Sequence, residues 1–250
     1  MISSTIVLLV INHAKTVEDA GSFEAALKTY GALMLEEPDV NGARKIEEIQ
    51  LTVMSDLYGK IDESRTLDEV LADLETNGLL RNIIEGVAKA LGTQLSADSI
   101  DIYRRLVEGE GDPEGPDAMP VLLAIQAIAR AYAEKYERRN GVSSGKDNTC
   151  SLCGTESDTM IVDGREYYMI CPLCGHKWRV SEGSPICPRC GEDRKLGVYS
   201  DRRGILGLAM CQSCGYSWHM ILGKVDAPKI MLPLIAMGAE RFRRALPDKE

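Results

Sequence analysis

The stretch that decides the fold is residues 150–215, CSLCGTESDTMIVDGREYYMICPLCGHKWRVSEGSPICPRCGEDRKLGVYSDRRGILGLAMCQSCG. It contains all eight cysteines of the chain, in four Cys-x-x-Cys pairs, and glycine directly follows each pair. In such a turn both thiolates face one metal ion, and the glycine can adopt a positive φ that a Cβ would disfavour. Two turns complete a tetrahedral site with four sulfur ligands. The sequence therefore predicts two metal sites, with the ligands Cys150, Cys153, Cys171, Cys174, Cys187, Cys190, Cys211 and Cys214.

An internal repeat indicates which pairs share a site. Each unit runs from a cysteine pair through a predicted hairpin into a second pair, and tryptophan (Trp178 or Trp218) lies four residues after the last cysteine. The spacings C-x2-C-x17-C-x2-C and C-x2-C-x20-C-x2-C suit rubredoxin-like or zinc-ribbon modules. We therefore expect two tandem four-cysteine modules, over residues 150–180 and 187–222, each with its own metal ion. The alternative is interleaved pairing, of first with third and second with fourth.

The aromatic and histidine residues beside these cysteines are interpreted as structural. Trp178 and Trp218 recur at one position of the repeat, and we expect both to pack against the metal sites. His176 and His219 flank the same turns. Because four thiolates already complete each tetrahedral site, we expect both histidines to lie on the surface rather than to bind metal.

The chain before the cysteines is predicted to be helical almost throughout. Apolar residues recur at three- and four-residue steps, and Thr66 with Glu69 has the pattern of a capping box that opens a helix. Glu18–Glu36 is one of the predicted helices, and the longest runs from about Asp117 to Arg139. A single buried stripe is expected along that longest helix, with its other faces in water, from the spacing of Leu122, Ile125, Ala129, Tyr132 and Tyr136.

These elements define the predicted fold class as α+β. We expect an all-α domain over residues 1–140, a linker rich in glycine, serine and charge, and the two metal modules within residues 150–222. A C-terminal helix is expected over residues 227–246, packing back on the rest of the chain.

Charge and composition limit the partners and the compartment. Residues 1–140 contain 14 basic and 25 acidic residues, and residues 141–250 contain 15 and 13, which together give the net charge of -9. An acidic first half disfavours nucleic acid as a partner. We find no convincing export signal and no apolar run long enough for a membrane span. We therefore expect a cytoplasmic protein, whose thiols stay reduced and can hold metal.

The ligand type narrows the metal to two candidates. Four thiolates in a tetrahedron suit zinc or a rubredoxin-type iron, and the ligand residues do not distinguish between the two metals. In either case metal binding would also fold hairpins that are too small to fold alone. All cysteines are assigned to metal, which argues against a thiol enzyme, and we find no serine or cysteine nucleophile with a partnered histidine.

Residues 165–178, REYYMICPLCGHKW, resemble the formate dehydrogenase accessory family, the FdhE-type proteins. Tyr168, Cys171, Leu173, Cys174 and Trp178 occupy the positions of that family's motif. The order of the four cysteine pairs and the ending DAPKIMLPLIAMGAERFRRALP are also similar, so the resemblance covers about residues 150–246. The helical first half contains no motif that matches.

The resemblance implies a cytoplasmic assembly factor and not an enzyme. Such a factor binds the catalytic subunit of a formate dehydrogenase-type oxidoreductase, and the cysteine pairs are involved in that contact. Three other functions use the same cysteines. They are a zinc-ribbon nucleic-acid or transcription-associated protein, an electron-transfer protein with two FeS4 centres, and a chaperone switched by disulfide formation.

Overall fold

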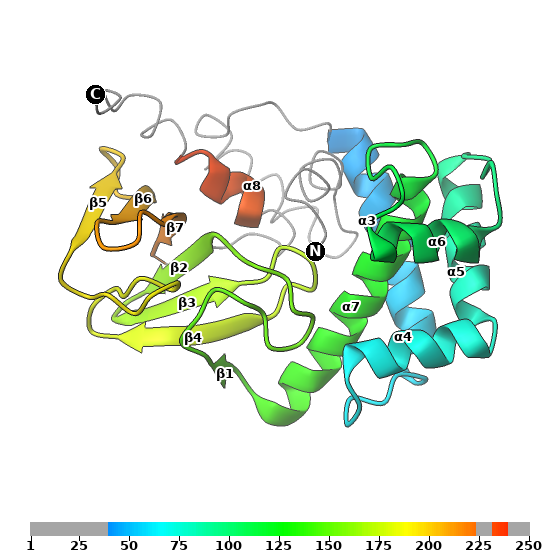
Figure 1. Ribbon diagram of the computed structural model, residues 1–250, viewed down its shortest axis with the longest axis horizontal. Helices are drawn as coiled ribbons and strands as arrows, with labels where there is room; N and C mark the ends of the chain where they lie inside the picture. Colours follow the sequence, from blue (N-terminus) through cyan, green and yellow to red (C-terminus); the bar gives the residue numbers. More distant parts are fainter. Residues whose placement is uncertain (1–39, 224–231, 240–250) are drawn as a thin grey trace. The chain divides into compact units, whose positions relative to one another are not determined.

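The computed structural model describes residues 40–223 and 232–239 (Figure 1). The predicted helix Glu18–Glu36 and both ends of the predicted C-terminal helix lie outside these residues. The described chain divides into two compact units, which meet in the sequence between Arg139 and Asn140. One unit is helical, and the other is built on a sheet. The α+β fold class predicted from the sequence is therefore confirmed, and each unit is described by itself below.

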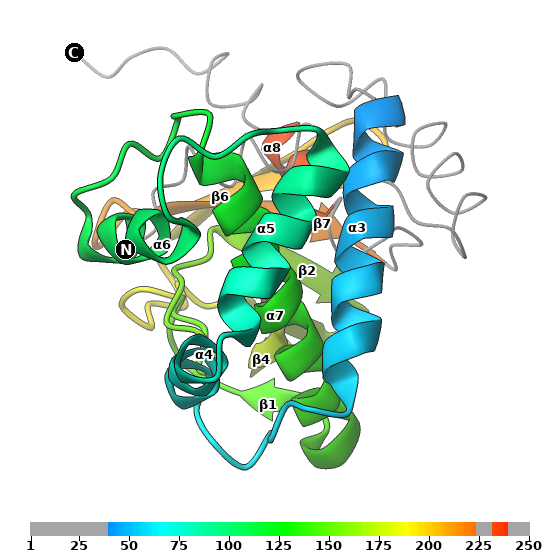
Figure 2. The ribbon, with the colours of Figure 1, turned by 90° about the vertical axis from the view of Figure 1, so that its right-hand side faces the viewer.

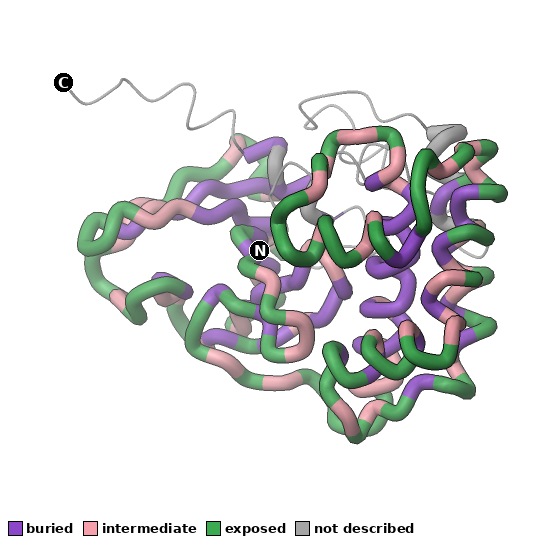
Figure 3. Tube along the Cα trace, turned by 45° about the vertical axis from the view of Figure 1, so that its right-hand side comes forward, coloured by how far each residue is buried: buried purple, intermediate pink, exposed green. Residues whose placement is uncertain are grey.

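The helical unit contains five described helices (Figure 2): α3 (Val40–Tyr58), α4 (Leu67–Thr76), α5 (Leu79–Leu91), α6 (Ser99–Glu108) and α7 (Ala118–Asn140). Along α4 and α5, apolar residues recur at three- and four-residue steps, and Leu74, Leu80 and Ile84 are buried. Figure 3 shows the resulting alternation of buried and exposed turns along the helices. The helical pattern of this part of the sequence thus places an aliphatic core between the helices.

The capping box predicted at the start of α4 is present. The Glu69 backbone N–H donates to the Thr66 hydroxyl at 3.2 Å, and the Thr66 backbone N–H donates to the Glu69 carboxylate at 2.8 Å. These bonds satisfy two donors that a helix start otherwise leaves without a partner. The same bond from the Thr66 N–H lowers the pKa of the Glu69 carboxyl, so the box is complete while Glu69 is ionised.

Replacing Thr66 with alanine is expected to destabilise the helical unit by about 1 kcal/mol, because the helix loses its capping hydroxyl. Urea unfolding of the whole chain, followed by the helical circular dichroism signal, measures this loss. Thr66→Ser is the matched control, because it keeps the hydroxyl and should stay close to the parent. Equal stability of the alanine and serine variants would contradict a role for the cap.

The longest helix, α7, is more buried than its sequence pattern predicted. From Ala118 to Ala133 only Met119 and Arg130 are partly exposed, so the expectation of solvent-exposed faces is wrong for this part of the helix. Much of this segment is alanine, and these alanines are fully buried. Their small side chains allow neighbouring residues to pack close to the helix axis. The polar Gln126 is also buried, and it accepts a hydrogen bond from the Gln50 side-chain amide on α3 at 2.6 Å.

The second unit contains one mixed sheet of seven strands, in the order β1-β4-β3-β2-β7-β6-β5 (Figure 1). The strands are β1 (Ser143–Ser144), β2 (Thr159–Asp163), β3 (Glu166–Ile170), β4 (Lys177–Glu182), β5 (Leu196–Ser200), β6 (Leu206–Cys211) and β7 (Ser217–Leu222). Strands β2–β4 form one antiparallel meander and β5–β7 form another. Parallel pairing of β2 with β7 joins them. The two predicted modules therefore share a single sheet.

A short helix, α8 (Leu232–Met237), covers part of this sheet. It packs on β7, β2 and β6, with Leu232, Ile235 and Ala236 buried. It lies within the range predicted for the C-terminal helix. Within that range the helix covers residues 232–237 and packs on the sheet of its own unit.

Candidate metal centres

The eight cysteines form two groups of four, Cys150 with Cys153, Cys171 and Cys174, and Cys187 with Cys190, Cys211 and Cys214. Within each group all four Sγ atoms lie within 4.8 Å of one another. The shorter separations are 3.3 Å between Cys153 and Cys171 and 3.6 Å between Cys190 and Cys211. A tetrahedral ion with metal–sulfur bonds of about 2.3 Å holds its sulfurs about 3.8 Å apart. The pairing is sequential, as the repeat predicted, and the interleaved alternative is wrong.

All four turns have the same backbone conformation. In the first, the Gly154 N–H donates to the Cys150 carbonyl at 2.9 Å and the Cys150 N–H donates to the Thr155 carbonyl at 2.9 Å. Equivalent bonds recur in the other three turns, and the glycines have positive φ values of 68°, 69°, 77° and 74°. The Cys174 N–H lies 3.4 Å from the Cys171 sulfur, to which it donates. Each turn therefore places two sulfurs side by side.

The sheet brings the turns of each group together. The first turn precedes β2, and the second connects β3 to β4, so the antiparallel β2–β3 hairpin places them at one end of the meander. The third turn precedes β5, and the fourth connects β6 to β7 in the same way. All eight cysteines are free thiols, and the sulfur separations exceed the roughly 2.05 Å of a disulfide bond. Each group therefore offers the four ligands of a tetrahedral metal site, and the chain can hold two ions.

The two groups differ in their exposure to solvent. In the first group Cys150, Cys171 and Cys174 are buried and Cys153 is half-buried. In the second group Cys187 and Cys211 are buried, whereas Cys190 and Cys214 are exposed. The second site is therefore open to solvent on one side, and the first is nearly enclosed.

The thiols of each group have unequal acidities. Burial raises the pKa of Cys171 and Cys174, whereas hydrogen bonds from Cys150, Cys171 and Cys174 lower the pKa of Cys153. In the second group burial raises the pKa of Cys187 to about 12. Burial acts in the same direction on Cys211, but backbone N–H groups of Cys214 and Ser213 stabilise its thiolate, and its pKa falls to about 7. A bare group thus favours some neutral thiols, while a bound cation stabilises all four thiolates.

We expect a chelator to remove metal from the second group before the first, because attack needs access to a bound sulfur or to the ion. The expected ratio of release rates is about tenfold or more, corresponding to a barrier difference of about 1.4 kcal/mol. Stopped-flow release from the zinc-loaded chain, with timed alkylation and peptide mapping, measures the order. If the variant Cys190→Ser/Cys214→Ser lacks the fast phase of metal release, that phase is assigned to the second group. A single phase in the parent chain would contradict the expected order.

Each tryptophan has an equivalent aromatic neighbour in its own module. The His176 ring stacks on Trp178 with 6.0 Å between centroids and 19° between planes, and Tyr216 stacks on Trp218 with 6.0 Å and 17°. Trp178 and Trp218 are both buried, on β4 and β7 directly after the second turn of each module. The structure thus confirms the repeat that was inferred from the sequence.

The expectation that both histidines lie on the surface is wrong. His176 is 0% exposed and His219 is 8% exposed, and neither belongs to a sulfur group. The His176 ring nitrogen Nε2 lies 2.8 Å from the Ser143 hydroxyl on β1, and His219 Nδ1 lies 3.6 Å from the Asp158 carboxylate. Both rings therefore act as core residues with polar contacts.

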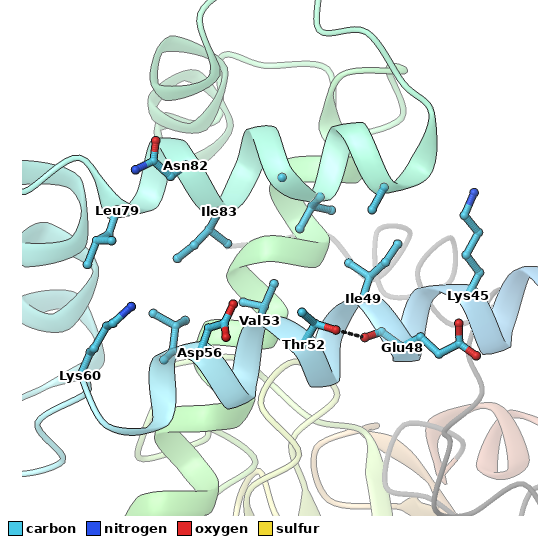
Figure 4. A pocket seen from close by; sticks show the side chains of 14 residues that line it. Lys45, Glu48, Ile49, Thr52, Val53, Asp56, Lys60, Leu79, Asn82 and Ile83 are labelled. Carbon is cyan, nitrogen blue, oxygen red and sulfur yellow. Dashed lines mark hydrogen bonds between the residues drawn. The ribbon is translucent and has the colours of Figure 1, made fainter.

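The helical unit contains an apolar groove between α3 and α5 (Figure 4), with a volume of about 560 Å³. Aliphatic side chains that include Ile49, Val53 and Ile83 line it, and Lys45, Asp56 and Lys60 are among its charged lining residues. The described residues that line this groove include no cysteine or histidine, and both four-cysteine groups lie in the other unit. None of the helices in the described ranges is long and apolar enough to cross a membrane.

Comparisons with known proteins give a likeness among solved structures. No family model matches the chain, and no curated protein matches its sequence. Among solved structures, the FdhE protein from Pseudomonas aeruginosa is similar over 81% of this chain and 84% of that chain, with 14% sequence identity and a TM-score of 0.45. The similar structure has the name of the family that residues 165–178 resemble.

Proposed function

We propose that this chain is an accessory factor for a formate dehydrogenase-type oxidoreductase and binds the catalytic subunit of that enzyme during assembly. The observation that supports the proposal is the gathering of all eight cysteines into two four-sulfur groups, on the segment that contains the family-like motif Arg165–Trp178. In this proposal the sulfurs hold metal, and the bound metal stabilises the sheet. In this proposal the chain is a binding protein and not an enzyme, and it acts in the cytoplasm, where thiols stay reduced.

Each four-sulfur group would hold one ion. The proposed ligands are Cys150, Cys153, Cys171 and Cys174 in the first site, and Cys187, Cys190, Cys211 and Cys214 in the second. Zinc is the proposed metal, with iron as the alternative, because both accept four thiolates in a tetrahedron. When bound, the ion would supply folding free energy to the sheet, and the four thiolates of each site would complete its tetrahedral coordination. Elemental analysis of chain purified without oxygen is expected to give two ions per chain.

The client is tested by direct capture. Full-length tagged chain, purified without oxygen, is mixed with lysate of its own organism, and the retained proteins are identified by mass spectrometry. The expected result is a formate dehydrogenase-type catalytic subunit, which then binds the chain when both are purified. Pro172→Ala, which alters the second turn but keeps all eight cysteines, should retain the client, and Cys171→Ser/Cys174→Ser should lose it.

A different set of retained molecules would overturn the proposal. Capture of RNA polymerase or nucleic acid, abolished by nuclease or by moderate salt, would assign the chain to the zinc-ribbon class of nucleic-acid proteins. Failure of the purified catalytic subunit to bind the metal-loaded chain would also reject the proposed client. Metal content is measured on each bait, so that loss of binding is not confused with loss of metal.

A further inference from the structure

The linker that follows the helical unit is held beside the sheet. Helix α7 ends at Asn140, and β1 begins at Ser143 and pairs in parallel with β4 (Figure 1). The Gly145 N–H donates to the Arg179 carbonyl at 3.0 Å, which continues this contact beyond β1. Residues 143–147 therefore lie beside β4, and we call them the strap.

Two buried aromatic side chains contact the strap. The Ser143 hydroxyl lies 2.8 Å from His176 Nε2, and the Trp178 Nε1–H donates to the Asp147 carbonyl at 3.0 Å. Gly145 lies directly against the indole, because a Cβ added there would be 2.9 Å from Trp178 Cδ1. His176 and Trp178 are almost completely buried, so the strap is part of what covers both rings.

The same two aromatic residues follow closely after the second cysteine turn. The His176 carbonyl accepts from the Cys171 N–H at 2.8 Å, so His176 contacts a proposed metal ligand through its backbone and the strap through its ring. Trp178 stacks on His176 and lies four residues after Cys174. One residue, His176, thus connects the strap to the first sulfur group.

A metal ion in the first group would join the two segments that make these contacts. The strap ends three residues before Cys150, and β4 begins three residues after Cys174. The Sγ atoms of Cys150 and Cys174 lie 3.6 Å apart, so one ion can bind both. Such an ion would fix the strap near β4 at one end, which lowers the loop-closure entropy that the remaining contacts must offset.

The second module has no equivalent strap among the described residues. Tyr216 occupies the position of His176, and its carbonyl accepts from the Cys211 N–H at 2.8 Å. The parallel neighbour of β7 is β2, a strand of the other meander, whereas the parallel neighbour of β4 is β1 in the linker. Because β1 lies at the end of the sheet, the strap can leave β4 without breaking either meander.

The strap is attached by few contacts. Strand β1 has two residues, and the side chains of Ser144, Lys146 and Asp147 face solvent. Segments with few buried contacts open at a lower free energy than a whole unit unfolds. A change at the first sulfur group can therefore alter how often the strap opens while the sheet stays folded.

We propose that docking of the strap on β4 is coupled to metal binding in the first four-cysteine group. With metal bound, the strap is docked, and two residues, 141 and 142, separate it from α7. Without metal, the strap opens, and the tether between the two units lengthens to the nine residues 141–149. Because linkage is reciprocal, the docked strap also strengthens metal binding. The inference rests on the metal sites of the proposed function and not on its client.

Hydrogen exchange of the Gly145 amide in the full chain measures opening of the strap, because that N–H donates to β4. Cys153→Ser removes a ligand of the first group, and Cys190→Ser is the matched control that removes a ligand of the second. We expect exchange at Gly145 to be about tenfold faster in Cys153→Ser than in Cys190→Ser. Amides of the β2–β3 hairpin, measured in the same samples, separate opening of the strap from unfolding of the sheet.

Variants of the strap provide the reciprocal measurement, and they keep all eight cysteines. Ser143→Ala removes the contact to His176, and Gly145→Ala adds a methyl group against the Trp178 ring. Ser144→Ala is the matched control, because the Ser144 side chain is exposed and makes none of these contacts.

Zinc affinity of these variants is measured by chelator competition at equilibrium, with alkylation and peptide mapping to report each sulfur group. The first group is expected to bind zinc about fivefold more weakly in Ser143→Ala and about tenfold more weakly in Gly145→Ala than in Ser144→Ala. The affinity of the second group should be the same in all three variants.

Two outcomes would overturn the inference. The first is a Gly145→Ala chain whose strap exchanges faster but whose first group binds zinc as tightly as in Ser144→Ala. The second is unchanged exchange of the strap in Gly145→Ala, because the strap would then not lie against the indole. If Cys153→Ser unfolds the sheet, the strap variants decide alone, since they retain every metal ligand.

No client is present in these measurements, so this inference and the proposed function can fail separately. A zinc-loaded chain that shows no coupling keeps its metal sites and its proposed client. A chain that binds no metal in the first group rejects that site, and with it the coupling. Failure to capture a catalytic subunit, with the coupling intact, rejects the client alone.

Discussion

Replacing Cys171 and Cys174 with serine is expected to remove the metal ion of the first group and to destabilise the sheet unit. The binding free energy of a structural zinc ion with thiolate ligands is of the order of 10 kcal/mol or more, and it contributes directly to folding. Serine keeps the size of the side chain but does not replace the thiolate as a ligand. Because Cys171 and Cys174 are both buried, the variant would also leave two hydroxyls in a nearly enclosed site.

The loss is expected to spread beyond the first module. Strand β2 pairs with β7 in parallel from Thr159 to Val162, so the second meander depends on the first for one of its neighbours. The measurement is metal content per chain together with near-ultraviolet circular dichroism, to which both tryptophans of the chain contribute from this unit. The helical signal should be largely retained, because the helical unit contains no cysteine.

Two comparisons make this result specific. Pro172→Ala, within the same turn, should keep both ions and the near-ultraviolet signal. Cys190→Ser/Cys214→Ser should also lose one ion, but with a smaller loss of structure, because these two side chains are exposed. A Cys171→Ser/Cys174→Ser chain that keeps two ions and an unchanged tryptophan signal would show that the first group is not a metal site.

The grouping of the cysteines was predictable because local geometry determines it. A Cys-x-x-Cys-Gly turn has one backbone conformation, and the repeated offset from Cys174 to Trp178 and from Cys214 to Trp218 marks the end of each module. A hairpin between two turns then brings them together without any contact from distant sequence. Sequence spacing therefore contained enough information to choose sequential over interleaved pairing.

The joining of the modules into one sheet was not predictable in the same way. It depends on the parallel pairing of Thr159–Val162 with His219–Leu222, about sixty residues apart in the sequence. No turn or spacing specifies that register, because it results from side-chain packing of two finished meanders. One clue was present: β6 (LGLAMC) contains no charged or strongly polar side chain, as expected for a strand that is covered on both faces.

Burial was underestimated wherever a polar residue had a partner far away in the sequence. His176 is buried because Ser143 on β1 lies beside its ring, and Gln126 is buried because Gln50 on α3 donates to it. A period count treats Gln126 as exposed, and His176 was expected on the surface because four thiolates already complete its site. Neither argument takes account of a distant partner that satisfies a buried polar group. The repeat contained a usable signal for His176, because it occupies the position of Tyr216 and an aromatic stack is the shared feature.

Truncation of either tryptophan is expected to be the most damaging change outside the cysteines. Trp178 and Trp218 are among the largest fully buried side chains, and replacement of a buried tryptophan by alanine costs about 3–5 kcal/mol. Trp178 also lies against the linker, where a Cβ added at Gly145 would be 2.9 Å from its ring. Urea unfolding of the sheet unit measures both losses, and the remaining tryptophan serves as the probe in each variant.

Phenylalanine substitutions should separate the two tryptophans. The Trp178 Nε1–H donates to the Asp147 carbonyl at 3.0 Å, whereas the buried Nε1–H of Trp218 has no hydrogen-bond partner among the described residues. Trp178→Phe loses ring volume and a hydrogen bond, while Trp218→Phe loses ring volume and removes a buried donor that costs free energy. We therefore expect Trp178→Phe to be more destabilising by about 1 kcal/mol. Equal losses at constant metal content would show that the Trp218 donor has a partner in the folded chain.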